Sequence, residues 1–331
     1  MLGLMRIVSQ RMQHKHSVLV LGDSADSEIL RHQGLYVLGS VQGTDNNSRT
    51  LGMRLRRAVE QVTSDQDQVI AWGWTPALAV SGLDCVHQVV AYVDAIDSMD
   101  ALEIEVDTVI PTTWTCGEML NSCRRCRASV TEPLVGIDAK TLVLEPSSVF
   151  KGLNLPSTSI LVPVVNDDAR WQEIVDVTVL LKSVGVELNM VVSSKYCHYA
   201  ALYFALEEHG LSHMLRRVPV GLRLIDVVHA ASFIWAPAST RSGRTDGILD
   251  LLSASASGVP VAASTEHAIT GVPTIGNRLG WVSSIAELCV WILDLVQDSS
   301  QVCEQAVELA ARVRTIASPA RFVEGLQLRV R

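Results

Sequence analysis

The stretch that decides the fold covers residues 233–264 and reads FIWAPASTRSGRTDGILDLLSASASGVPVAAS. It opens with the apolar run 233–237, which has the length of a buried strand and ends at a proline. Apolar residues in the range 248–252 give the next segment one apolar helical face, and Gly258 ends that helix. Residues 259–263 form a second buried run. Two buried runs joined by one helix predict a right-handed strand-helix-strand crossover in an open parallel sheet.

A polar loop lies between the first buried run and the helix. Residues 238–246 are small and polar apart from two basic residues, Arg241 and Arg244. Asp246 is placed to cap the first turn of the helix. Because ligands of open parallel sheets bind outside the carboxyl ends of the strands, this loop is the first candidate for a functional site.

The same stretch resembles the signature of the family 4 glycosyltransferases, which are retaining enzymes of the GT-B fold that use nucleotide-sugar donors. That signature runs proline-serine, a variable loop, Glu-Gly-Phe-Gly, a leucine pair, Glu-Ala-Met-Ala, one residue, and Gly-Xaa-Pro-Val. Six residues stand at matching positions: Pro237, Leu251, Leu252, Gly258, Pro260 and Val261. Thr245 and Ser253 stand where the family has its two glutamates, the second of which holds the donor ribose.

The resemblance implies a GT-B-like α/β fold of two Rossmann-like domains, whose parallel sheets face each other across a cleft. Apolar runs alternate with helical segments in both halves of the chain, which is the pattern of doubly wound domains. We predict an acceptor-type domain over residues 1–141, a linker over 142–157, and a nucleotide-sugar domain over 158–331. The family also implies that the last segment packs back on the first domain.

Composition narrows the classes of partner. The 331 residues suffice for two domains, and 48% hydrophobic against 19% charged residues indicates a large buried core. A net charge of -8 argues against binding to nucleic acid or to anionic membranes, which needs a basic face. The chain lacks a secretory core at its start and any apolar run long enough to span a bilayer. These features predict a cytoplasmic protein.

The seven cysteines predict reduced thiols in that compartment. Cys116, Cys123 and Cys126 fall with Leu120 on one face of a predicted helix. No fourth ligand lies beside them in the sequence, so we expect buried thiols there in place of a zinc site. Neither a metal nor a cofactor is expected, and the nucleotide sugar is a substrate.

The first half carries two further candidate residues. Gly22 follows the first buried run and allows a backbone to approach a ligand, as in phosphate-binding turns, although a single glycine is also typical of an ordinary tight turn. Asp94 stands at the position of the histidine that lies near the reacting sugar in the family, which makes it the candidate catalytic residue. Ile70 and Trp72 replace two histidines of an earlier family strand.

The second half carries the donor site that the resemblance implies. Where the family grips the diphosphate with an arginine and a lysine, this chain offers Arg170, and Arg241 and Arg244 could supply the missing charge. Asp250 shares a helical face with Ser253 and could reach a ribose hydroxyl. Ordinary alternatives are exposed loop arginines and an acid favoured by the helix dipole. The candidate donor-binding residues are Gly22, Arg170, Arg241, Arg244, Thr245, Asp246, Gly247, Asp250 and Ser253.

Two functions follow from these observations. The first is transfer of a sugar from a nucleotide-diphosphate sugar to an unidentified acceptor, of the retaining hexosyltransferase type. The second is a catalytically inactive GT-B-fold protein that acts as a binding or partner subunit. The family resemblance favours the first function. The absence of the family's histidine, cationic pair and both glutamates favours the second.

Overall fold

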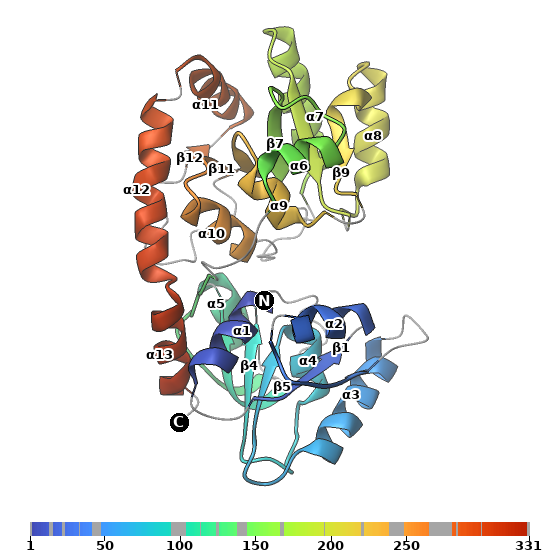
Figure 1. The fold of residues 1–331 in the computed structure, drawn as a ribbon, viewed down its shortest axis with the longest axis vertical. Helices are drawn as coiled ribbons and strands as arrows, with labels where there is room; N and C mark the ends of the chain where they lie inside the picture. Colours follow the sequence, from blue (N-terminus) through green and yellow to red (C-terminus); the bar gives the residue numbers. More distant parts are fainter. Residues whose placement is uncertain are drawn as a thin grey trace. The chain divides into compact units, whose positions relative to one another are not determined.

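The structure is a computed structural model of the chain, and it divides the chain into two compact units. Unit 1 comprises Met1–Asp138 and Ala317–Arg331, and unit 2 comprises Ala139–Ile316. Every described strand pair in both units is parallel (Figure 1). The structure describes residues 2–12, 16–21, 24–32, 34–41, 48–93, 104–112, 114–123, 126–137, 144–165, 169–194, 196–219, 222–237, 248–264, 280–282, 284–298 and 300–329.

Unit 1 is built from two parallel sheets and the helices that connect their strands. Strands β1 and β2 form one sheet, and the other has the order β3-β4-β5-β6. In chain order the elements are α1 (Leu2–Arg11), β1 (Val18–Leu21), α2 (Ser24–His32), β2 (Val37–Val41), α3 (Ser48–Val62), β3 (Gln68–Trp72), α4 (Trp74–Ala79), β4 (Gln88–Val93), β5 (Ile104–Pro111), α5 (Trp114–Ser122), β6 (Cys126–Val130) and α13 (Pro319–Arg329).

The core of unit 1 is centred on β4, which lies between β3 and β5. Its residues Val90, Ala91, Tyr92 and Val93 are fully buried, so the strand is covered on both faces. A strand of this kind reads as a continuous apolar run because neither face meets water. This explains why the sequence predicts β4 well.

Helix α13 completes unit 1 although it comes from the other end of the chain. The ring of Phe322 is fully buried and lies 5.6 Å from the ring of Tyr92 and 6.4 Å from that of Trp72. Gly136 lies against the same ring, where an added Cβ would stand 2.6 Å from Phe322 and 2.8 Å from Leu4 of α1. Only glycine allows this close approach. Gly136, in the segment that follows β6, therefore lets helices α1 and α13 pack directly against that segment.

Unit 2 contains a six-stranded sheet of order β12-β11-β10-β7-β8-β9. This is the strand order 6-5-4-1-2-3 of a Rossmann fold, counted from β7. In chain order the elements are α6 (Pro146–Gly152), β7 (Ile160–Val164), α7 (Trp171–Ser183), β8 (Leu188–Val192), α8 (Tyr199–Glu208), the short 3-10 helix η2 (Ser212–Met214), β9 (Leu215–Arg217), α9 (Leu224–His229), β10 (Ile234–Ala236), α10 (Ile248–Ala256), β11 (Val261–Ser264), β12 (Gly280–Val282), α11 (Ile285–Gln297) and α12 (Ser300–Ile316).

The stretch 233–264 forms the predicted crossover from β10 through α10 to β11. Ile234 pairs with Val261, and Ala236 pairs with Ala263. The residues of β10 are buried because strands β7 and β11 flank it and helices cover it. The sequence prediction for this stretch is therefore confirmed where the chain is described, and residues 238–247 lie outside the described residues.

Three local features differ from the sequence analysis. The segment 142–157 contains helix α6, whose Val149 and Phe150 are buried in a cluster with residues of unit 2. Helix α1 was not predicted, because its apolar face is short and is buried by α13. The predicted helical face that includes Cys126 is wrong, because α5 ends at Ser122 and Cys126 begins strand β6.

The described helices include none with both the length and the apolar character needed to cross a membrane.

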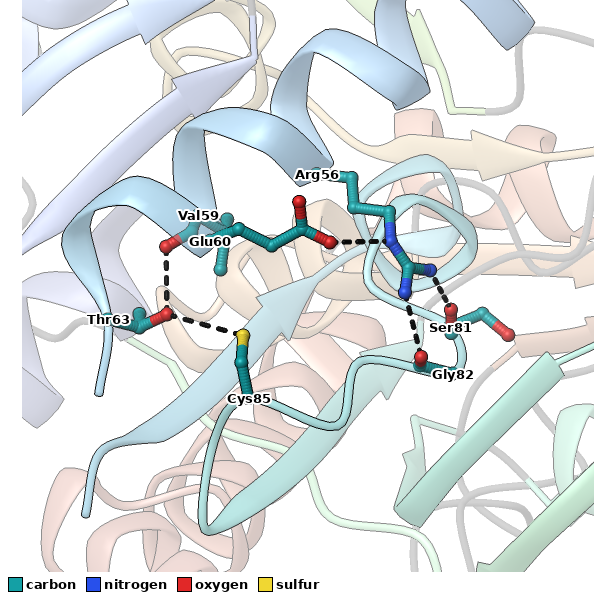
Figure 2. A network of polar contacts seen from close by, with 7 residues as sticks. All are labelled: Arg56, Val59, Glu60, Thr63, Ser81, Gly82 and Cys85. Carbon is teal, nitrogen blue, oxygen red and sulfur yellow. Dashed lines mark hydrogen bonds and ion pairs between the residues drawn. The ribbon is translucent and has the colours of Figure 1, made fainter. Parts of the chain in front are cut away.

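Arg56 of helix α3 joins that helix to the turn after α4. Its guanidinium donates to the carbonyl oxygens of Ser81, at 2.5 Å, and Gly82, at 2.8 Å, and its Nε lies 3.0 Å from a carboxylate oxygen of Glu60 (Figure 2). The carbonyl groups beyond a helix end carry partial negative charge, so a cation stabilises them. Arg56 thus fixes one helix against the end of the next.

Replacement of Arg56 by alanine is expected to lower the free energy of unfolding of unit 1 by about 2 kcal/mol, because charge-assisted hydrogen bonds to backbone carbonyls are lost. Arg57, which is exposed on the same helix, gives the matched control, and its alanine variant should change stability by less than about 0.5 kcal/mol. Urea unfolding of both variants measures the difference. Equal effects would show that Arg56 contributes only as a surface charge.

Candidate functional site

The sheet of unit 2 has one position where the strand order reverses. The connections that leave β7 lead toward β9, whereas those that leave β10 lead toward β12. Since β7 and β10 are neighbours, their carboxyl ends form the point at which ligands of such sheets bind. We call the carboxyl ends of β7 and β10, Val164 and Ala236, together with the starts of α7 and α10, the switch-point edge.

The start of α7 is held in place by a buried tyrosine. Tyr196, which follows β8, donates its hydroxyl hydrogen to the carbonyl oxygen of Ala169 at 2.9 Å, and both residues are buried. Arg170 comes next and is the N-terminal cap residue of α7, with an extended backbone and an exposed side chain. The first amide groups of a helix have no partner within the helix and favour anions. The switch-point edge therefore offers an arginine beside a helix N-terminus.

Helix α10 begins at the same edge of the sheet, because it follows β10. Asp250 lies in its first turn, and Ser253 lies three residues further along. Ser253 is partly buried, and its carbonyl oxygen accepts a hydrogen bond from the hydroxyl of Ser257 at 2.9 Å. The fold thus brings Arg170 and the start of α10 to one edge of the sheet. Arg170, Asp250 and Ser253 are the candidates that lie within the described residues.

The other candidates lie outside the described residues. The segments that contain them connect described elements: one follows β1, one follows β4, and one leads from β10 to α10. The candidates in these segments are Gly22, Asp94, Arg241, Arg244, Thr245, Asp246 and Gly247.

Sequence reasoning missed an arginine at the start of α9. Arg223 caps this helix and donates to the carboxylate of Asp226 from Nε, at 2.8 Å, and from a terminal nitrogen, at 2.5 Å. Asp226 is 1% exposed and also accepts from the backbone amide of Leu144 at 3.1 Å. The side chain of Arg223 is 53% exposed, so it can meet a ligand while its orientation is fixed. An acid three residues after a helix cap is the signal that could have found this pair.

Two opposing influences set the pKa of Asp226. Burial alone would raise it, but the hydrogen bonds from Arg223 and Leu144 and the charge of Arg223 outweigh burial, so the pKa lies below its usual range. The carboxyl is ionised at neutral pH. It therefore anchors α9 and the residues before α6 through a charged group.

Replacement of Asp226 by asparagine is expected to lower the free energy of unfolding of unit 2 by about 2 kcal/mol at neutral pH, because hydrogen bonds to a buried charge are lost. Since the folded pKa is lowered, this contribution is complete above about pH 4 and is lost as the pH falls through the folded value. Urea unfolding at about pH 7 and about pH 3 should show the difference between wild type and variant shrinking. A constant difference would contradict an ionised Asp226.

The corresponding edge of unit 1 is apolar at the positions where the family has histidines. Trp72, at the end of β3, lies with its ring 5.3 Å from that of Tyr92, and Tyr92 donates its hydroxyl hydrogen to the carbonyl oxygen of Leu134 at 3.0 Å. Ile70 is partly buried and lines a cavity of about 530 Å³ in unit 1. The described lining of this cavity contains no arginine, lysine or histidine, which makes it unsuited to a diphosphate.

A metal site is not evident in the part of the chain that the structure describes, where no three histidine, cysteine, aspartate or glutamate side chains converge as ligands would.

Comparison with solved structures identifies the fold. HepE from Anabaena in complex with UDP-glucose has a TM-score of 0.71 at 13% identity, over 98% of this chain and 94% of that chain. A glycosyltransferase from Rickettsia africae has a TM-score of 0.68 at 12% identity, over 99% and 93% of the two chains. WaaG, a glycosyltransferase involved in lipopolysaccharide biosynthesis, has a TM-score of 0.66 at 12% identity, over 99% and 95%.

No protein-family profile and no curated protein matches the sequence. At 11–13% identity the likeness to solved structures concerns the fold. The three structures compared above have the GT-B fold, and the match to each extends over nearly the whole chain. The predicted fold class is therefore confirmed: the chain has the α/β fold of the GT-B type.

Proposed function

We propose that this protein is a glycosyltransferase that takes its sugar from a nucleotide-diphosphate sugar bound at the switch-point edge of unit 2. The observation that carries the proposal is the strand order of the six-stranded sheet, which places β7 and β10 side by side in a GT-B fold. A structure of this fold, HepE, was solved with UDP and with UDP-glucose. The proposal does not specify the acceptor.

The diphosphate is the part of the donor that depends most on contacts with the protein. Its charge requires cations and amide groups, and the same groups stabilise the charge that develops on the leaving nucleotide. Arg170 is at the start of α7, and we assign Arg241 and Arg244, which precede α10 in the sequence, to the same task. We assign Thr245, Asp246 and Gly247, which follow these arginines in the sequence, to the donor sugar.

The ribose and the reacting sugar need polar partners of another kind. We assign the ribose hydroxyls to Asp250 and Ser253, since both lie on the first two turns of α10. Gly22 is assigned to the donor and Asp94 to the catalytic step, because these residues directly follow β1 and β4. Arg223 adds a fixed cation at the start of α9.

Calorimetric titration with nucleoside diphosphates and nucleotide sugars tests the binding part of this proposal. A ligand at 100 times its dissociation constant should stabilise unit 2 by about 2.7 kcal/mol and so raise its unfolding temperature. Transfer is tested by release of the nucleoside diphosphate in the presence of candidate acceptors. No binding across the whole panel would refute the proposal.

The same measurements decide the inactive alternative. Binding of a nucleotide sugar with no hydrolysis or transfer, for any acceptor offered, would leave a GT-B-fold protein that acts as a binding or partner subunit. A cytoplasmic location is part of this proposal and fits either function.

A further inference from the structure

Two cysteines stand at the two ends of one tight turn in unit 1. Cys123 directly follows helix α5, and Cys126 is the first residue of strand β6. The backbone amide of Cys126 donates to the carbonyl oxygen of Cys123 at 3.1 Å. A hydrogen bond of this kind closes a four-residue turn and brings the two Cα atoms within about 7 Å. Cα atoms bridged by a disulfide are about 4.4–6.8 Å apart, so the turn sets the separation that a disulfide needs.

Both thiols also share one environment. The two side chains are partly buried and pack against the core of unit 1. Burial raises the pKa of the Cys126 thiol, and the charge of a Cys123 thiolate raises it further. The turn keeps the pair close in space as well as in sequence.

The remaining cysteines are placed differently. Cys116 is buried two helical turns before Cys123, and Cys85 lies with its sulfur 4.0 Å from the hydroxyl of Thr63. In unit 2, Cys197 is exposed in the turn before α8, Cys303 is exposed on α12, and Cys289 is partly buried on α11. Cys123 and Cys126 are the pair that a turn holds together.

We propose that Cys123 and Cys126 form a redox site, which closes to an intramolecular disulfide when it meets a low-molecular-weight disulfide such as oxidised glutathione. Cys-Xaa-Xaa-Cys pairs are a common arrangement for such chemistry. The redox pair, as we call Cys123 and Cys126, would link the end of α5 to the start of β6.

The reaction takes place in two exchange steps. The thiolate of Cys123 attacks one sulfur of oxidised glutathione, forms a mixed disulfide, and releases one glutathione thiolate. The sulfur of Cys126 then attacks the Cys123 sulfur, forms the protein disulfide, and releases the second glutathione. Two protein thiols are oxidised, one glutathione disulfide is reduced, and the two protons pass to the two glutathione thiolates. Because its pKa is raised, the Cys126 thiol is less often ionised, which suits the second, resolving role.

The redox pair lies away from the edge where ligands of the sheet bind. A helix that follows one parallel strand and leads to the next ends at the amino edge of the sheet. The end of α5 and the start of β6 are at that edge, whereas ligands bind at the carboxyl edge. Oxidation of the pair should therefore leave nucleotide affinity unchanged, and the test below does not depend on the proposed function.

Mass spectrometry of the oxidised wild-type protein tests the proposal. The protein is exposed to oxidised glutathione until the exposed Cys197 and Cys303 have each gained a glutathionyl group, which serves as the internal control. Cleavage after glutamate, which does not occur at the Glu132-Pro133 and Glu145-Pro146 bonds, then releases residues 119–173 as one peptide, which contains the redox pair and no other cysteine. We expect this peptide to lose two hydrogens and to gain no glutathionyl group.

A variant identifies the order of attack. Replacement of Cys126 by serine should leave Cys123 with a stable glutathionyl group, since the resolving thiol is absent. In the wild type, glutathionyl groups on this peptide, or two unreacted thiols while Cys197 and Cys303 have reacted, would overturn the proposal.

Discussion

Replacement of Phe322 by alanine is expected to lower the free energy of unfolding of unit 1 by about 3–5 kcal/mol. The ring is fully buried, contacts the rings of Trp72 and Tyr92, and fills the space that Gly136 leaves open. Removing it leaves a cavity and weakens the attachment of α13 to unit 1. Hydrogen exchange followed by mass spectrometry can measure this unit separately, because its peptides differ from those of unit 2.

Leu328 provides the matched control on the same helix. Its side chain is 67% exposed, so alanine at this position should change stability by less than about 0.5 kcal/mol. If the Phe322 and Leu328 variants have equal exchange rates throughout unit 1, the docking of α13 described above is wrong.

Replacement of both Arg241 and Arg244 by alanine is expected to weaken nucleotide binding by about 100-fold or more. A bound diphosphate needs charge-assisted hydrogen bonds, each of which contributes about 1.5–3 kcal/mol, so two such losses come to about 3–6 kcal/mol. The fold should remain intact, because arginines in a polar loop, as the sequence predicts here, contribute little to stability. Calorimetric titration with the tightest-binding nucleoside diphosphate measures the loss.

The control for this double variant is replacement of Arg312 by alanine. Arg312 is exposed on α12 of unit 2, and its loss changes the charge of the same unit without touching the proposed site. Affinity should then stay within about twofold of wild type, since a distant exposed charge is screened by salt. Unchanged affinity in the Arg241 and Arg244 double variant would show that the diphosphate does not bind at these arginines.

The sequence predicts the sheet centres well because buried parallel strands read as continuous apolar runs. Strands β4, β7, β8 and β10 are of this kind, since nearly all of their residues are buried. Strand β6 escapes prediction because it is at a sheet edge, where only alternate residues are partly buried. Its apolar content is too low to distinguish it from the end of the preceding helix.

Contacts between distant parts of the chain explain the other differences. The apolar face of α1 is recognisable only once α13 is known to cover it, and the two helices come from opposite ends of the chain. Helix α6 was predicted as linker because of its proline, although proline is well suited to the first turn of a helix.

In the candidate site, too, some features follow from the sequence and others depend on contacts between distant residues. The position of Arg170 after β7 follows from sequence order, and in the structure it is the N-terminal cap residue of α7. The bond from Tyr196 to Ala169, which holds that start in place, joins residues 27 apart and has no local signal. The bond from Leu144 to Asp226 spans 82 residues and is equally invisible in the sequence. Local chemistry can thus be predicted, whereas the partners that orient it cannot.

The central claim is that a nucleotide donor binds at the switch-point edge of unit 2, and hydrogen exchange with and without nucleotide tests it most directly. The nucleoside diphosphate that gives the largest thermal shift should slow amide exchange at residues 169–174 and 248–253, at the starts of α7 and α10. Amide exchange should not change along β1 and β3, the strands that line the cavity of unit 1. It should also not change at the redox pair. Protection confined to β1 and β3, or none at a saturating concentration, would contradict the account.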